Sequence, residues 1–221
     1  MSQSDPPALT ASRYGRYVGL VGLIVVVLIT INTLLTPSNG ATGIPPGERL
    51  APFAVPLATS TLNGDADVAT RPGDESSGRR PACTLRSAQI LNICELYERG
   101  PVVLALFVDS GDCPAVLDDL QKLAPSFPGV GIAGVALKGN RAKLRELVSA
   151  HELTLPIGFD RDGALAARYK ISSCPQLTFA YPGGVVQSKA LLTRPPLATL
   201  RARIAALVAA SRTRGWKPPT T

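Results

Sequence analysis

The sequence predicts an α/β fold in which helices flank a central mixed β-sheet, with one transmembrane helix at the N-terminus. Short apolar runs typical of buried strands alternate with segments whose apolar residues recur at helical spacing, and this alternation favours a layered α/β domain. The chain has 221 residues. About 170 of them follow the N-terminal segments, which is enough for one domain with its own core.

An uncharged apolar run, residues 18–35, is expected to be a transmembrane signal anchor whose partner is the lipid membrane. A helix of this length spans about 27 Å, close to the thickness of the hydrocarbon core. Arg13 and Arg16 precede the run. The positive-inside rule therefore predicts a cytoplasmic tail over residues 1–17 and an extracytoplasmic domain. A cleaved signal peptide is the alternative, but the run is longer than a usual h-region and no Ala-x-Ala site follows it.

The rest of the chain is expected to form a linker, one domain and a short tail. Residues 36–49 are rich in Pro, Gly, Ser and Thr, a composition typical of a linker. Residues 50–212 are expected to form the domain and residues 213–221 the C-terminal tail. Within the domain we expect, in order, a strand at 53–57, a long loop at 59–82, a helix at 86–97, a strand at 102–107, a helix at 114–126, a strand at 129–137, helical segments at about 140–152 and 163–169, strands near 176–181 and 185–190, and a final helix at about 196–212.

Different patterns predict the strands and the helices of this domain. Residues 102–107 and 129–137 are apolar runs of strand length, and Tyr181-Pro-Gly-Gly184 is a turn signal that predicts a β-hairpin. The two long helices are amphipathic, with apolar side chains on one side: Val116, Leu117, Leu120 and Leu123 in the first, and Leu197, Leu200, Ile204, Leu207 and Val208 in the last. A β-α-β-α portion followed by a hairpin and a helix is the element order of a thioredoxin-like sandwich.

Cys113 is the first candidate for chemistry, because it lies at the junction of a predicted strand and a predicted helix. The free N–H groups and the dipole at a helix N-terminus stabilise a thiolate and lower the pKa of a cysteine placed there. A second cysteine three residues later would complete a CxxC pair, but Val116 occupies that position. Cys174 lies 61 residues later, directly before Pro175.

The chain has four cysteines, and an exported domain favours disulfides over metal ligands. We expect no metal site, since no CxxC exists and the only histidine, His151, is interpreted as a surface residue. Ten residues separate Cys83 from Cys94, and we expect these two to form a structural disulfide that restricts the unfolded chain. The alternative is that Cys83 reaches Cys113 as a resolving thiol.

Several segments, taken together, resemble the TlpA/ResA and AhpC/TSA (redoxin) branch of the thioredoxin superfamily over roughly residues 48–210. The quoted segments are Leu50-Ala-Pro-Phe53 for the opening strand, Gly100-Pro-Val-Val-Leu-Ala-Leu-Phe107 for the first core strand, Gly111-Asp-Cys113-Pro114 for the active-site entry, Phe159-Asp-Arg-Asp-Gly163 through Ala167-Arg-Tyr-Lys-Ile171 for the segment before the cis-proline loop, and Cys174-Pro-Gln-Leu-Thr-Phe-Ala-Tyr-Pro-Gly-Gly-Val185 for that loop and its hairpin.

The resemblance implies that Pro175 is a cis-proline whose loop lies beside the nucleophilic cysteine. Cys174 would then lie near Cys113, and the two would form a non-contiguous catalytic pair in a groove shaped by Pro114 and Pro175. Val116 cannot resolve a mixed disulfide, so that role falls to Cys174. The resemblance implies no organic cofactor. The expected partners are protein thiols or disulfides, with a membrane reductase as the electron donor.

Two other functions stay open on the sequence. One is a non-catalytic thioredoxin-like binding module in which a Cys113–Cys174 disulfide is purely structural. The other is a peroxiredoxin-like thiol peroxidase, in which Ser110 would stand for the usual threonine although Leu106 occupies the usual proline position. The formal charge of +7 is concentrated after Asp162, where nine basic and no acidic residues follow. We interpret this end as a solvated basic helix face, with an anionic membrane surface as the alternative, and expect no nucleic-acid partner.

Overall fold

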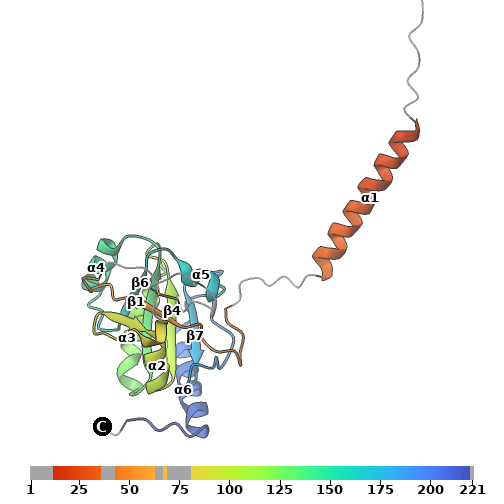
Figure 1. Ribbon diagram of the computed structural model, residues 1–221. Helices are drawn as coiled ribbons and strands as arrows, with labels where there is room; N and C mark the ends of the chain where they lie inside the picture. Colours follow the sequence, from red (N-terminus) through yellow and green to blue (C-terminus); the bar gives the residue numbers. More distant parts are fainter. Residues whose placement is uncertain (1–11, 36–42, 63–66, 69–80, 220–221) are drawn as a thin grey trace, which may run out of the picture. The chain divides into compact units, whose positions relative to one another are not determined.

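The computed structural model describes residues 12–35, 43–62, 67–68 and 81–219 (Figure 1). The chain divides into two units, Met1–Gly40 and Ala41–Thr221. The expected cytoplasmic tail lies mostly outside the described residues, as do residues 36–42 of the expected linker and most of the expected loop at 59–82.

The first unit contains one helix, α1 (Ser12–Leu35), which includes the expected apolar segment 18–35. Its described side chains between Tyr17 and Ile31 are exposed. Among the residues that the structure describes, no helix is both long and apolar enough to cross a membrane. The transmembrane part of the predicted fold is therefore not confirmed.

The second unit is built on a four-stranded mixed sheet in the order β6-β5-β4-β7. Its strands are β4 (Val102–Phe107), β5 (Gly131–Leu137), β6 (Ile157–Asp160) and β7 (Gln176–Ala180). The first three strands are parallel, and β7 is antiparallel to β4, with Leu106 opposite Gln176. This sheet, with helices on both faces, confirms the predicted α/β class (Figure 1).

Successive side chains of β4 point to opposite faces of the sheet, so this strand contributes to two cores. Val102, Leu104 and Leu106 pack with a second, smaller sheet, described next, and with helices α2 (Ile93–Arg99) and α5 (Ala164–Arg168). Val103, Ala105 and Phe107 pack with α3 (Ala115–Leu123), α4 (Arg141–Ala150) and α6 (Leu197–Thr213). All six residues of β4 are buried, which explains the unbroken apolar run.

A second, three-stranded sheet covers one face of the first. It has the order β2-β1-β3, with β1 at Phe53–Pro56, β2 at Asp67–Val68 and β3 at Ile90–Asn92. Strand β1 lies close to β6, and a Cβ atom on Gly158 would lie 2.5 Å from Cγ2 of Val55. Only glycine fits this approach of two strands.

The prediction of a helix at 86–97 is wrong for the first half of that segment. Residues 90–92 form β3, and α2 begins only at Ile93, after a short 3₁₀ helix at Ala82–Thr84. Asn92 ends the strand because its side chain accepts the N–H of Cys94 at 2.8 Å and so caps the helix.

Two strand predictions also differ from the structure. No strand is expected near 157–160, yet β6 forms there. Conversely, no strand forms at 185–190. The turn forms, because Tyr181 N–H donates to Val185 O. The segment after the turn bonds to two different parts of the chain: Val186 N–H donates to Glu48 O, and Gln187 N–H donates to Phe179 O of β7. Isolated bridges join Ala180 to Val186 and Leu177 to Leu191, so the return carries a two-residue bulge.

Both ends of the expected domain differ from the structure. Residues 43–49, expected as linker, pack on it: Ile44 is buried, and Gly47 N–H donates to Val186 O at 2.9 Å. At the other end the chain after α6 returns to the start of β4. A Cβ atom on Gly129 would lie 2.4 Å from Cδ of Pro219, and one on Gly100 would lie 3.3 Å from Nε1 of Trp216. A cavity of about 420 Å³ lies beside Trp216.

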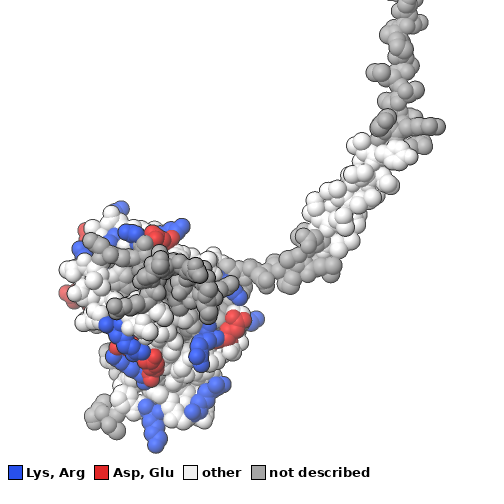
Figure 2. Space-filling model, in the orientation of Figure 1, with Lys and Arg blue, Asp and Glu red and all other residues white. Residues whose placement is uncertain are grey.

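The C-terminal end of the domain is basic. Figure 2 shows Lys and Arg side chains at the end that α6 forms, whereas both signs of charge mix elsewhere on this face. Arg201, Arg212 and Lys217 are exposed, and the Arg214 guanidinium stacks 3.9 Å from the centre of the Tyr181 ring. The predicted solvated basic face therefore includes one cation held against an aromatic side chain.

Candidate functional site

The structure brings Cys113 and Cys174 together in a disulfide, with an S–S distance of 2.00 Å and a Cα–Cα distance of 5.5 Å. Both cysteines are half-buried, whereas Pro114 and Pro175 are buried. The peptide bond between Cys174 and Pro175 is cis. All four residues to which the sequence assigned the reactive pair and its groove therefore lie at one place, beyond the C-terminal end of β4.

The end of β4 and the start of α3 position Cys113. The chain turns after Phe107, and Ala115 N–H donates to Asp112 O at 3.2 Å. Pro114 is the N-cap of α3 and has a φ of −68°, which a proline ring adopts without cost. Cys113 lies one residue before this cap, within reach of the positive end of the helix dipole.

The register of β7 on β4 positions Cys174. Leu106 lies opposite Gln176, so two residues further along each strand Val108 approaches Cys174. Val108 N–H donates to Cys174 Sγ at 3.2 Å. The adjacent Gln176 is fully buried, and its side chain donates to Tyr169 O at 3.0 Å. Strand pairing therefore fixes the cysteine before the cis bond, whereas Cys113 lies in a turn.

Charged side chains lie in the turn that carries Cys113 and on the helix that follows it. Asp109 and Asp112 lie in the turn that carries Cys113. Arg194, from the loop before α6, pairs through Nε with Asp119 Oδ2 of α3 at 2.7 Å. The hydrogen bond to Asp119 raises the pKa of Arg194, and the charges of Asp118 and Asp112 act in the same direction. Arg194 therefore ties the loop to α3 and offsets the acidic character of the Cys113 turn.

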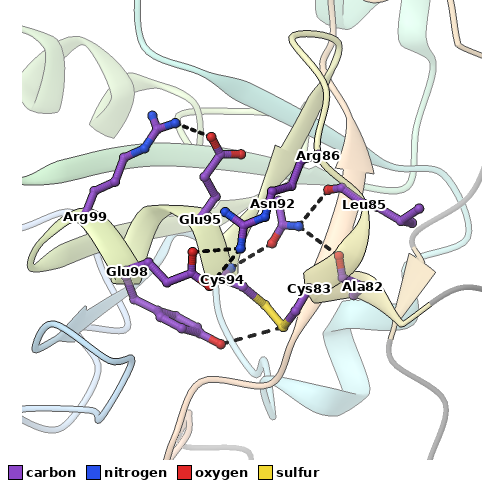
Figure 3. A network of polar contacts seen from close by, with 10 residues as sticks. Ala82, Cys83, Leu85, Arg86, Asn92, Cys94, Glu95, Glu98 and Arg99 are labelled. Atoms are coloured by element: carbon purple, nitrogen blue, oxygen red, sulfur yellow. Dashed lines mark hydrogen bonds and ion pairs between the residues drawn. A yellow bond between two sulfur atoms is a disulfide. The ribbon is translucent and has the colours of Figure 1, made fainter.

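The other two cysteines form a second disulfide away from this site, with an S–S distance of 1.94 Å and a Cα–Cα distance of 5.4 Å (Figure 3). Cys94 is fully buried in α2. Asn92 crosses this region and donates from Nδ2 to the carbonyls of Ala82 and Leu85 at 2.8 and 2.7 Å. In this state Cys83 pairs with Cys94 and not with Cys113, as the structural interpretation expects.

His151 lies on the surface at the end of α4, as the sequence predicts. Its side chain is 42% exposed, and Nδ1 is 2.9 Å from Asp118 Oδ1. Within the described part of the chain, no three His, Cys, Asp or Glu side chains gather closely enough to hold a metal ion.

The sequence did not identify three residues that shape the surroundings of the cysteines. Val108 contacts Cys174 through its backbone N–H, and Arg194 pairs with Asp119 of α3 across 75 residues of sequence, so neither leaves a local signal. Asn92 does leave one: it is an N-cap residue followed three positions later by Glu95, the spacing typical of a helix start.

No family model matches the sequence. The thiol-disulfide oxidoreductase ResA of Oceanobacillus iheyensis is 29% identical over 77 residues, which is 34% of this chain and 40% of ResA. The match thus spans less than half of that relative.

Solved structures match over a larger share of the chain. A candidate thiol:disulfide interchange protein DsbE from Chlorobium tepidum superposes with a TM-score of 0.55 at 12% identity, covering 76% of this chain and 98% of that one. The fold is thioredoxin-like. Peroxidoxin BcpB of Mycobacterium tuberculosis superposes almost equally, with a TM-score of 0.54 at 14% identity and coverage of 76% and 97%. The thioredoxin-like neighbours therefore include both exchange and peroxidoxin proteins, and only the site can separate these activities.

Proposed function

We propose that the protein is an extracytoplasmic thiol–disulfide oxidoreductase in which Cys113 and Cys174 are the redox pair. The observation that carries the proposal is the half-exposed Cys113–Cys174 disulfide at the C-terminal end of β4, with one partner preceding a helix and the other preceding a cis-proline. The partial similarity to ResA supports the same class of reaction.

In the reducing direction, the Cys113 thiolate attacks one sulfur of a substrate disulfide. A Cys113–substrate disulfide forms, and the other substrate sulfur leaves as a thiolate that takes up a proton. Cys174, as a thiolate, then attacks Cys113 Sγ and expels the second substrate thiolate. Two electrons pass to the substrate, and the pair ends as a disulfide. A dithiol protein, which we propose to be a membrane reductase, reduces the Cys113–Cys174 disulfide again. In this proposal Pro114 and Pro175 shape the groove that binds the substrate.

The test is trapping of the mixed disulfide. Cys174→Ser should accumulate a covalent complex with a disulfide substrate, because the resolving thiol is gone. Cys113→Ser should form no complex and should lose exchange to the background of the buffer. The matched control is the Cys83→Ala/Cys94→Ala double variant, which should keep wild-type exchange. The wild-type pair should have a reduction potential above the value of about −300 mV below which structural disulfides usually lie.

Two other results would replace this function. If wild type shows no exchange and the Cys113–Cys174 bond resists strong reductant, the protein is a non-catalytic binding module with two structural disulfides. If peroxide oxidises Cys113 rapidly and Cys174→Ser does not slow the reaction, the protein is a thiol peroxidase. Ser110 is exposed near Cys113, whereas Leu106 is buried within β4.

The location of the domain is a separate proposal that rests on the sequence. The uncharged run 18–35 after Arg13 and Arg16 favours a single-pass anchor with the N-terminus in the cytoplasm. Protease added outside intact cells or spheroplasts should then digest the domain, and the domain should sediment with membranes. A protected domain, or one released with the soluble fraction, would contradict the anchor and its orientation.

A further inference from the structure

The two sulfurs of the Cys113–Cys174 disulfide differ in their hydrogen bonding. Cys174 Sγ accepts the backbone N–H of Val108 at 3.2 Å. No group within the described residues donates to Cys113 Sγ. The difference follows from the fold. The register of β7 on β4 places Val108 beside Cys174, whereas Cys113 lies in a turn whose preceding residues are exposed.

Val108 N–H is the last donor of the ladder between β4 and β7. Beyond Leu106 and Gln176 the cis bond at Pro175 ends the pairing, and the Val108 amide would otherwise lack a partner in a half-buried place. The Cys174 side chain takes over the role of the missing carbonyl. A disulfide sulfur is a weak acceptor, but a thiolate is a strong one. The same hydrogen bond therefore gains strength when the disulfide opens.

The charges around the two cysteines add to this difference. Asp112 adjoins Cys113 and Asp109 lies four residues before it, so negative charge opposes a thiolate there, although the helix dipole favours one and Arg194 offsets part of that charge. Cys174 lies between Ser173 and Pro175, without a charged neighbour in the sequence. Its packing against the core formed with α3 and α6 disfavours a thiolate, so the Val108 N–H is the group that favours one.

We infer that Cys174 is the leaving sulfur of the disulfide and that the Val108 amide stabilises its thiolate, which leaves Cys113 as the sulfur that substrates attack. This inference rests on the proposed function. When a substrate thiolate attacks Cys113 Sγ, a substrate–Cys113 bond forms, the Cys113–Cys174 bond breaks, and the electron pair goes to Cys174 Sγ. Departure is faster for the sulfur with the lower thiol pKa. The reverse step, attack by Cys174 on the same mixed disulfide, restores the bond and releases the substrate thiolate.

The test measures the pKa of Cys174 without any substrate. Cys113→Ala leaves Cys174 reduced and alone and adds no hydroxyl that could donate to it. In this variant the Cys174 pKa, read from the pH dependence of alkylation by iodoacetamide, should lie below about 8.5, the value for an unperturbed cysteine. Adding Val108→Pro removes the N–H and should raise this pKa by about one unit. Adding Val108→Ala keeps the N–H and should leave the pKa unchanged.

A spectroscopic measurement covers the case in which Val108→Pro fails to fold. In Cys113→Ala, the amide proton resonance of Val108 should shift with pH at the Cys174 pKa. A resonance that does not follow this titration would overturn the inference. So would a Cys174 pKa at or above the ordinary value.

Kinetics with a small thiol then test the leaving-group role in the intact pair. Opening of the oxidised wild-type disulfide by glutathione should place glutathione on Cys113, and Val108→Pro should slow the opening severalfold more than Val108→Ala. Glutathione found mainly on Cys174 would overturn the inference. If the pKa and resonance results hold but no protein disulfide is exchanged, the proposed oxidoreductase function fails while the stabilised Cys174 thiolate stands.

Discussion

Removal of the Cys83–Cys94 disulfide is expected to lower the free energy of unfolding by about 2–3 kcal/mol. The bond closes a loop with a sequence separation of 11, and its loss frees the unfolded chain to adopt more conformations. The disulfide also holds the 3₁₀ helix at Ala82–Thr84 against α2. Both cysteines pack with the core to which β1 and β3 contribute. The Cys83→Ala/Cys94→Ala double variant avoids placing a hydroxyl at the fully buried position 94.

Denaturant unfolding, followed by circular dichroism, measures this effect. The midpoint should fall in the double variant, and thiol exchange at Cys113 should stay at the wild-type rate, because the two disulfides share no residue. Dithiothreitol on the wild type is a less clean control, since it opens both bonds. An unchanged midpoint, or mass spectra that find Cys83 and Cys94 as free thiols in the oxidised native protein, would refute the structural role.

Replacement of Asp160 by Ala is expected to cost about 2–4 kcal/mol of stability. Asp160 ends β6 and is fully buried. Its carboxylate accepts three backbone N–H groups at the start of α5, from Gly163 at 3.1 Å, Ala164 at 3.2 Å and Leu165 at 2.9 Å. The alanine variant removes this partner from the N–H groups of Ala164 and Leu165, of which Leu165 is buried, whereas Gly163 N–H keeps the backbone O of Asp160 at 3.3 Å. Asp162→Ala is the matched control, because that side chain is 59% exposed and its loss should change stability by less than about 0.5 kcal/mol.

The Asp160 carboxyl also gives this effect a pH dependence of known sign. Burial raises the pKa of Asp160 above its ordinary value, although the three N–H groups act in the opposite direction. A group whose pKa is higher in the folded than in the unfolded protein contributes a stability that is complete below the unfolded pKa and is lost as the pH rises through the folded pKa. The stability difference between wild type and Asp160→Ala should therefore shrink as the pH rises through this interval. A difference that grows with pH would show that the hydrogen bonds outweigh burial.

The sequence predicts the elements whose patterns are strong and local. Strand β4 is a pure apolar run between Gly100 and a turn, and α3 and α6 carry apolar residues at helical spacing. The place of Cys113 after β4 follows from the same pattern. Its partner does not, because two residues 61 positions apart carry no local sign of contact. Only the resemblance to redoxins implied that Cys174 would meet Cys113.

The errors fall where distant segments decide the local structure. Strand β6 has only four residues, with Gly158 and Asp160 among them, so its apolar pattern is weak although all four are buried between two layers. The segment after Tyr181 has the residues of a strand, but Glu48 takes one of its N–H groups and a bulge interrupts the rest. The Val108 contact belongs to the backbone, and the amino acid type at position 108 gives no indication of it.

The return of the C-terminal segment to the start of β4 has a practical consequence. Trp216 lies beside Gly100, two residues before β4 begins. The strand measures about 20 Å, and Cys113 follows its other end. A fluorophore or biotin handle joined directly after Pro219, which lies beside Gly129, should thus emerge from the side of the domain opposite the cysteines. When immobilised through such a handle on a sensor chip, the protein should present the Cys113–Cys174 disulfide to the solution, away from the chip surface.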